Sequence, residues 1–528
     1  MNTYCQLAPT ANSLKADIQN RLRQSYYTFL LIIPLIKKIV NSFSKYLFTF
    51  KLYYDILLSD NYKGNEIMQL KSKLIGTKAF YMRVIAIVVP MIIQNTITNV
   101  VSLLDNVMVG RVGTLEMSAV TIVNQLMFVF YLCIFGGMAG AGIFLTQFAG
   151  AGDNKGVRYC VRMKAVIGLI LSAVAIAVFL IFKTPLVEMY IAKDTLPAAY
   201  QKTLNLAVSY LEIMVIGIVP FALTQVYASS LREVGETKLP MLSSIIAILV
   251  NLVFNYLLIF GKFGFPKLGV VGAAIATVLS RFVETGIIIV VTTVKRKKFS
   301  FAEGLFKSLY IPFNLCKKIT TKGVPLLINE FMWSAGMAIL LQCYSVRGIT
   351  VLSAVNISNT VNNLFNVVFI TMGNAVAIIV GQHLGANEIE KAKEAVWQLY
   401  TLAVSACVVM GGIMACLAPF VPYIYKTEPE VRQMATQFLF VVAALMPMFA
   451  FAHNCYFTLR SGGKTLITFL FDSAFTWAVA VPLAFVLSKY TNLPIVPLYL
   501  IIQSLDFVKC VIGFILVKKG LWIKNLIE

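Results

Sequence analysis

An internal repeat is the feature that most constrains this chain of 528 residues. The stretches Val89–Met91 and Gly113–Ala151 reappear as Val324–Leu326 and Gly348–Ala386, each 235 positions later and without a gap (325 − 90 = 235). The longer stretch is matched by identical residues at Gly113, Ser118, Ala119, Val120, Ile122, Asn124, Phe130, Gln147, Gly150 and Ala151. The repeat indicates two homologous halves, an arrangement common among helical membrane proteins.

The composition indicates that lipid surrounds most of the chain. Hydrophobic residues make up 59% and charged residues 13%, and the mean hydropathy is +0.81, which a water-soluble surface could not accommodate. Apolar segments long enough to cross a bilayer begin near Met82, Met117, Cys160, Thr203, Leu239, Gly269, Val324, Val351, Ala395, Met434, Leu466 and Ile495. We therefore predict an all-α polytopic membrane protein with about twelve transmembrane helices, six in each half.

The positive charges predict the orientation in the membrane. The net charge is +22, but the basic residues occupy alternate turns rather than one face, which argues against a nucleic-acid binder. They include Lys71, Lys73, Lys78, Arg83, Lys155, Arg158, Arg162, Lys164, Lys295 to Lys298, Lys317, Lys318, Lys322, Lys518, Lys519 and Lys524. The positive-inside rule then places both termini in the cytoplasm, and we expect a multi-pass protein of the plasma (inner) membrane.

Six spans separate the two repeats, so both halves point the same way. Their pseudo-two-fold axis should stand along the membrane normal, with a shared cleft between two six-helix lobes. The expected division is an N-terminal extension over 1–67 that is not native or poorly ordered, an N-lobe over 68–294, a cytoplasmic linker over 295–323 and a C-lobe over 324–528. The linker contains an amphipathic piece near Ser300–Phe313. We expect a monomer.

Polar residues within the first and fifth spans predict an ion site. Asp105 lies 15 residues after Pro90 (105 − 90 = 15), and Asn251 and Asn255 share one helix face at a similar depth in the fifth span. A buried charge costs on the order of 3 kcal/mol and demands a partner or a purpose. One carboxylate and two carboxamides suit a dehydrated Na⁺ or a carboxyl that takes up H⁺. The alternative is that the two amides only join helices and hydrogen-bond a neutral aspartate.

The second half carries its own polar residues. Glu330, Asp472 and His453 are expected in the inner half of the membrane, where acidic groups would favour a cationic substrate or accept a proton. A structural hydrogen bond between His453 and a carboxylate is the alternative. Asp506, a further candidate for this cleft by its depth, is also placed to pair with Lys509 at the i,i+3 spacing, as Glu284 is with Arg281.

Catalytic chemistry has little support in the sequence. The nine cysteines include no CxxC pair, and there are only two histidines. We find no nucleophile or metal constellation, and therefore expect a protein that is not an enzyme and has no cofactor beyond a coupling ion.

Several motifs together resemble the multidrug and toxic compound extrusion (MATE) family. They are Gly235–Pro240, Asn251–Gly261, Gly264–Ala274 and Asp105–Gly110, and the likeness extends from about Met68 to the C-terminus. The resemblance implies two six-helix lobes around a V-shaped cleft. It also implies export of drug-like, often cationic molecules by antiport with Na⁺ or H⁺. In that family the first-span aspartate and the fifth-span pair form a cation and protonation site, which carries over to Asp105, Asn251 and Asn255.

Two departures from the family pattern limit what the resemblance implies. Asn255 stands where some relatives have Asp, and Phe449 stands where some carry a tenth-span aspartate. The family's C-lobe ion site is therefore not transferred to this chain. A flippase for lipid-linked oligosaccharide or cell-wall precursors, built on the same lobed plan, remains the alternative function. An intramembrane enzyme and a channel have less support, because the chain shows neither a catalytic constellation nor a repeated pore loop.

Overall fold

The computed structural model describes residues 74–191, 196–425 and 427–528. The predicted extension over 1–67 lies outside the described residues. Within the described residues, eleven helices are long and apolar enough to cross a membrane, or twelve if one bent pair is counted as a single span. The all-helical fold and the number of spans are as predicted.

The first half begins with α4 (Lys78–Gly110), and the second half begins with α12 (Phe313–Ser345). The other helices of the first half are α5 (Thr114–Gly150), α6 (Asn154–Ile181), α7 (Lys183–Glu188), α8 (Pro197–Ile216), α9 (Ile218–Glu233), α10 (Lys238–Phe260) and α11 (Val270–Val294). Those of the second half are α13 (Ile349–Gly385), α14 (Ile389–Leu417), α15 (Pro429–Ser461), α16 (Thr465–Phe469), α17 (Val481–Tyr490), α18 (Ile495–Ser504) and α19 (Asp506–Lys518).

Glycine and proline determine where the helices bend. α8 and α9 form the bent pair, which turns by 46° at Gly217, three residues before Pro220. Pro90 and Pro325 lie inside α4 and α12 at matching repeat positions, where each removes a backbone donor.

Two short π-helical turns join α16 to α17, so that Thr465–Tyr490 forms one span. α18 and α19 together form the last span.

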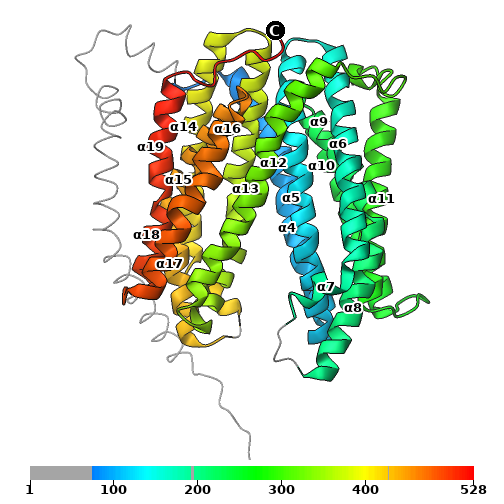
Figure 1. Ribbon diagram of the computed structural model, residues 1–528, viewed down its shortest axis with the longest axis vertical. Coiled ribbons are helices and arrows are strands. Elements are labelled where there is room, and N and C mark those ends of the chain that lie inside the picture. Colours follow the sequence, from blue (N-terminus) through cyan, green and yellow to red (C-terminus); the bar gives the residue numbers. More distant parts are fainter. Residues whose placement is uncertain (1–73, 192–195, 426) are drawn as a thin grey trace, which may run out of the picture.

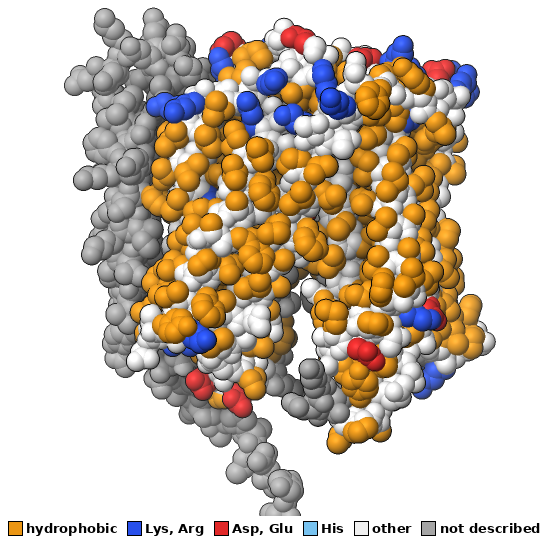
Figure 2. All heavy atoms as spheres, viewed as in Figure 1, with side chains coloured by type: hydrophobic (Ala, Val, Ile, Leu, Met, Phe, Trp, Pro, Cys, Tyr) orange, Lys and Arg blue, Asp and Glu red, His pale blue; other side chains and the backbone are white. Residues whose placement is uncertain are grey.

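The helices form two bundles that meet at one end and diverge at the other (Figure 1). Buried residues of α5, α6, α8, α9 and α11 dominate the core of the first bundle, and those of α13, α15 and α18 dominate a core of the second. Figure 2 shows a hollow between the bundles where they diverge, a broad apolar belt, and most visible Lys and Arg side chains at the end where they meet. We call these the open end and the closed end; the C-terminus lies at the closed end (Figure 1).

At the closed end, α4 and α12, the first helix of each half, each pack into the core of the opposite bundle. Val84 and Met91 of α4 are buried in a core made largely by α13, α14 and α15 of the second bundle. Their repeat counterparts in α12, Ile319 and Leu326, are buried in the core of the first bundle (319 − 84 = 235; 326 − 91 = 235). The pseudo-two-fold predicted from the repeat is therefore also visible in the packing between the bundles.

Glycines bring the two bundles into backbone contact. A Cβ atom placed on Gly150 of α5 would lie 1.9 Å from the carbonyl oxygen of Gln382 in α13. A Cβ atom placed on Gly385 of α13 would lie 1.9 Å from the carbonyl oxygen of Gln147 in α5. Only glycine permits this approach, and because Gly150 and Gly385 are repeat counterparts, α5 and α13 cross at the pseudo-two-fold axis.

The segment between the halves differs from its prediction. α12 begins at Phe313, so residues 313–323 of the predicted linker are helical. The expected amphipathic piece is a short 3₁₀ turn (Ser300–Ala302) followed by loop. Arg162 of α6 holds this loop by donating to the carbonyl oxygens of Leu305 (2.6 Å) and Tyr310 (2.9 Å). Such contacts with backbone oxygens leave no pattern in the linker's own sequence.

Candidate functional site

Asp105, Asn251 and Asn255 lie together, as their depth predicted. Asp105 is near the open-end terminus of α4, and the two asparagines occupy successive turns of α10. Nδ2 of Asn255 donates to Oδ1 of Asp105 at 2.7 Å and to Oδ1 of Asn251 at 3.0 Å. Both asparagines are buried, with exposed fractions of 6% and 1%, and Asp105 is partly buried. The helix repeat places both amides on one face, and the packing of α4 on α10 supplies the carboxylate.

Asn251 can serve the carboxylate as well. The side-chain amide atom that faces Asn255 lies 3.2 and 3.3 Å from the two carboxylate oxygens of Asp105. With the amide turned over, its NH₂ group donates to Asp105 and its oxygen accepts from Oγ1 of Thr277 at 3.3 Å. The oxygen and nitrogen of a side-chain amide are assigned from the hydrogen bonds that surround them. In this orientation both carboxamides donate to one carboxylate, which stabilises its ionised form.

One oxygen at this site has no partner. Among the described residues, Oδ1 of Asn255 is buried and accepts no hydrogen bond. A buried polar atom without a partner is rare and costs about 1–3 kcal/mol. The cluster therefore offers a carboxylate, a spare carboxamide oxygen and a second carboxamide, which are hard oxygen ligands of the kind Na⁺ accepts. The residues present fit either a small cation or a proton on Asp105.

A second group of polar contacts lies nearer the closed end on the same three helices, α4, α10 and α11. Nε2 of Gln94 donates to Oγ of Ser244 at 2.7 Å, and Ser244 donates to Oε1 of Glu284 at 2.5 Å. Glu284 also pairs with Arg281 at 3.3 Å, which confirms the predicted i,i+3 pair. We call these residues, together with Asp105, Asn251, Asn255 and Thr277, the polar seam. Gln94 and Asp105 are about 16 Å apart along α4 at 1.5 Å per residue.

The acidic residues of the second half are not a free acidic patch. Nζ of Lys509 lies 3.2 Å from Oδ1 of Asp506, as the i,i+3 spacing predicted, and also 3.2 Å from Oδ1 of Asp472. Asp472 further accepts a hydrogen bond from Nδ2 of Asn329 at 3.3 Å. One partly buried lysine thus pairs with two of the candidate carboxylates and offsets one of their two negative charges. The expectation that this cluster favours a cationic substrate or accepts a proton stays a prediction.

Glu330 and His453 lie close enough to Asp472 to interact with it electrostatically, although neither belongs to the Lys509 ion pair. A Cβ atom on Gly136 of α5 would lie 2.9 Å from Cγ of Glu330, so the glutamate side chain lies at the contact between the bundles. The His453 ring packs against Phe369 and Phe457, with centroids 5.3 and 4.9 Å away. Within the described part of the chain, Nε2 of His453 is buried without a hydrogen-bond partner. The alternative interpretation of His453, a hydrogen bond to a carboxylate, is therefore not formed through Nε2.

The sequence analysis missed a buried ion pair at the closed end. Lys164 of α6 is fully buried, and its Nζ lies 2.5 Å from Oε2 of Glu233 and 2.9 Å from Oγ of Ser229. A lysine in an apolar span was a signal, but its partner lies 69 residues away in α9. Lys164 was counted among the basic residues that predict the orientation in the membrane, and the structure shows that it also pairs with Glu233.

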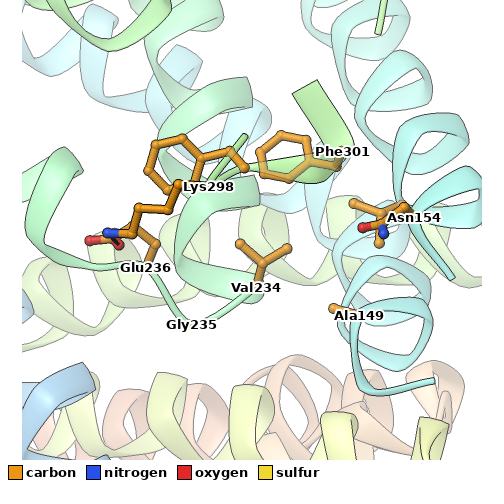
Figure 3. A pocket seen from close by; sticks show the side chains of 9 residues that line it. Ala149, Asn154, Val234, Gly235, Glu236, Lys298 and Phe301 are labelled. Carbon is orange, nitrogen blue, oxygen red and sulfur yellow. Dashed lines mark hydrogen bonds and ion pairs between the residues drawn. The ribbon is translucent and has the colours of Figure 1, made fainter. Parts of the chain in front are cut away.

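A pocket of about 310 Å³ lies beneath the linker at the end of the first bundle that carries the α9–α10 turn. Figure 3 shows Phe301 and Lys298 on one side of it, Asn154 and Ala149 on another, and the turn Val234–Glu236 between them. Lys298 pairs with Glu236 at 2.5 Å. The pocket lies at the end of α10 opposite to the one that carries Asn251 and Asn255, and the ion pair between Lys298 and Glu236 satisfies both of their charges.

Comparison with known proteins agrees with this architecture. The family model MatE matches residues 90–257 and 325–486, which are two copies covering more than half of the chain. The solved structure of the outward-facing conformation of a multidrug resistance MATE family transporter superposes with a TM-score of 0.73 at 19% identity. It covers 83% of this chain and 95% of that protein. At this identity the likeness shows the fold.

Two relatives extend the match over most of the chain. The probable multidrug resistance protein NorM of Thermotoga maritima is 26% identical over 409 residues, covering 78% of this chain and 86% of the relative. The probable multidrug resistance protein YoeA of Bacillus subtilis is 27% identical over 421 residues, covering 77% and 87%. With both repeats matched by one family model and the two-bundle helical fold in place, the chain belongs to the MatE family of multi-pass membrane transporters.

Proposed function

We propose that this protein exports drug-like, often cationic organic molecules by antiport with Na⁺ or H⁺. The observation that carries this proposal is the buried cluster of Asp105, Asn251 and Asn255, in which one carboxylate accepts from a carboxamide while a carboxamide oxygen stays free. The curated relatives NorM and YoeA, both described as probable multidrug resistance proteins, support the substrate class.

The closed end is proposed to face the cytoplasm. Lys and Arg side chains gather there, whereas the open end carries few of them (Figure 2). The positive-inside rule assigns the basic end to the cytoplasm. The described state then opens outward, ready to release its cargo and to load an ion from outside. Both termini would lie in the cytoplasm of a cell with this protein in its plasma (inner) membrane.

Antiport follows if Asp105 binds its ion and the cleft binds its cargo with different affinity in the two states. An ion that enters through the open end would neutralise Asp105 and change its demand for amide donors. The bundles then rock, the ion leaves to the cytoplasm and cargo replaces it. One elementary charge moving inward through a 100 mV potential supplies about 2.3 kcal/mol for this exchange.

The two candidate ions make different demands on the site. A proton needs no movement of heavy atoms, because Asp105 already accepts from Asn255 at 2.7 Å and can lose that bond on protonation. Sodium needs the Asn255 carboxamide to turn its oxygen toward Asp105; this oxygen has no bond to lose, but Nδ2 gives up its bonds to Asp105 and Asn251. The geometry therefore suits H⁺ directly and Na⁺ after rotation of the Asn255 side chain.

Efflux from proteoliposomes tests the proposal. The purified protein is reconstituted into vesicles that are loaded with ethidium. The vesicles are then given an inward Na⁺ gradient, an inward pH gradient, or neither. We expect ethidium to leave at least about tenfold faster with one of the gradients than with none, because the ion gradient then drives the exchange between the two states. Equal rates of ethidium efflux in all three conditions would contradict the proposal of antiport.

The same vesicles separate the flippase alternative. A fluorescent lipid-linked oligosaccharide is added to one leaflet, and its accessibility to a membrane-impermeant quencher is followed. We expect no acceleration over protein-free vesicles, because Lys509 at the C-lobe acidic cluster is already paired with Asp472 and Asp506 and is not free to bind a lipid phosphate. Rapid translocation of the lipid without ethidium efflux would favour the flippase.

A further inference from the structure

Two repeat-matched glutamines cross between the bundles at the closed end. Nε2 of Gln382 in α13 donates to the carbonyl oxygen of Glu233 at the end of α9, at 2.8 Å. Nε2 of Gln147 in α5 donates to the carbonyl oxygen of Ser461 at the end of α15, at 3.1 Å. Gln147 and Gln382 are 235 positions apart, and the acceptors also end matching helices of the two halves. Each bundle thus holds a helix end of the other through the same bond.

We call Gln147 and Gln382, each with its acceptor carbonyl in the opposite bundle, the two clamps. They differ in the partner of the glutamine Oε1 atom. Oε1 of Gln382 accepts from Nη2 of Arg83 in α4 at 2.6 Å. The repeat counterpart of Arg83 is Lys318 (318 − 83 = 235), yet Oε1 of Gln147 accepts from the backbone N–H of Leu526 at 2.8 Å. Nε2 of Gln147 also donates to the carbonyl oxygen of Lys524 at 3.2 Å. The segment after α19 therefore completes the clamp on one side of the pseudo-two-fold.

That segment, Leu521–Glu528, is anchored in both bundles, and we call it the strap. Leu526 is 7% exposed and belongs to the core of the first bundle. Trp522 is 2% exposed and belongs to a core of the second bundle. A Cβ atom on Gly462 would lie 1.7 Å from the carbonyl oxygen of Trp522, so the strap also fits closely against the turn after α15. The strap connects the two bundles across the end where they meet.

We propose that Gln147, Gln382 and the strap form a latch that holds the closed end shut, and that the strap must leave Gln147 and the first bundle before this end can open. The proposal rests on the alternating access of the proposed function. The bonds from Gln382 to Glu233 and from Gln147 to Ser461 join atoms of opposite bundles, so neither survives a separation of those bundles. Gln147 makes two further bonds to the strap, at Lys524 and Leu526, and Leu526 adds apolar burial against the first bundle.

Distance measurements between the bundles test the latch without any transport. Spin labels are attached through Lys155→Cys and Glu390→Cys, which replace exposed, repeat-matched residues in the first turns of α6 and α14. The other cysteines are replaced, and double electron–electron resonance reports the distance distribution in nanodiscs. We expect Gln147→Leu and Gln382→Leu each to raise the ratio of long to short distances by about tenfold, as loss of one or more such bonds allows.

Truncation isolates the strap. Deletion of residues 524–528 removes two bonds to Gln147 and the buried Leu526, and should raise the same ratio by at least about tenfold. Leu526→Ala, which keeps the backbone donor, should give a smaller shift and provides a second variant if the truncated chain fails to fold. Gln342→Leu, at an exposed carboxamide of α12, is the matched control and should leave the distribution unchanged.

Two results would overturn the proposal. Unchanged distributions in both glutamine variants would mean that the clamps do not hold the bundles together. A shift in Gln147→Leu but none after truncation or in Leu526→Ala would mean that the strap is not part of the latch. The distances are measured without substrate or ion gradient, so they test the latch even if ion-driven ethidium efflux is not observed. Conversely, the efflux assay tests the proposed function even if the variants leave the distances unchanged.

Discussion

Asp105→Asn is expected to abolish ion-driven efflux while leaving the protein inserted and folded. Asparagine keeps the shape of the side chain and can still hydrogen-bond Asn255, but it cannot take up H⁺ and offers Na⁺ no charge. Without ion binding at this position, the gradient no longer distinguishes the two states. In the ethidium assay, the rate with an imposed ion gradient should therefore fall to the rate without a gradient.

The matched control is Asp153→Asn, the same substitution outside the polar seam. Asp153 caps α6 by accepting from the backbone N–H groups of Lys155 (2.9 Å) and Gly156 (3.1 Å). Asparagine is an equally good N-cap. We expect this variant to retain wild-type efflux and melting temperature. Wild-type efflux in Asp105→Asn, with the control also active, would contradict the assignment of the coupling site.

A single methyl group at the crossing of α5 and α13 is expected to force the bundles apart. In Gly150→Ala or Gly385→Ala the new Cβ would lie 1.9 Å from a backbone oxygen, and neither α5 nor α13 can move a carbonyl group without moving the helix. Overpacking of this kind costs about 1–3 kcal/mol. Each variant should melt several degrees lower in detergent and lose most gradient-driven efflux, because the closed end cannot re-form.

The controls are alanine substitutions of glycines that have space around them. Gly286 of α11 and Gly412 of α14 are helical, and an added Cβ would meet no atom within 4 Å at either position. Alanine there should be neutral or stabilise its helix by up to about 1 kcal/mol. If Gly150→Ala and Gly385→Ala melt and transport like these two controls, the close crossing of α5 and α13 is not required for transport.

Much of the fold could be predicted because a bilayer imposes length and polarity on each span. Helix geometry then fixes depth, which is how Asp105 could be matched with Asn251 and Asn255 although 150 residues separate Asp105 from Asn255. Depth alone does not say which helices touch. The contact of α4 with α10 therefore became certain only with the structure.

The remainder depends on tertiary contacts that have no local signature. Lys509 was predicted to pair with Asp506 within one helix, but its second partner, Asp472, lies on another span. Gln147 was visible as an identity in the repeat, yet nothing in the sequence indicated that its partners would be backbone atoms near residues 461, 524 and 526. Side chains that bind backbone groups of distant helices leave no pairing pattern in the sequence.

The central claim is that loading of an ion at Asp105 and binding of a drug are coupled in one protein. The most direct measurement adds ethidium to the purified protein in weakly buffered detergent solution and follows the release of H⁺ with a pH dye and of Na⁺ with a sodium electrode. We expect release of about one ion per bound dye in the wild type and none in Asp105→Asn. Dye binding without ion release in the wild type, or equal release in Asp105→Asn, would contradict this claim.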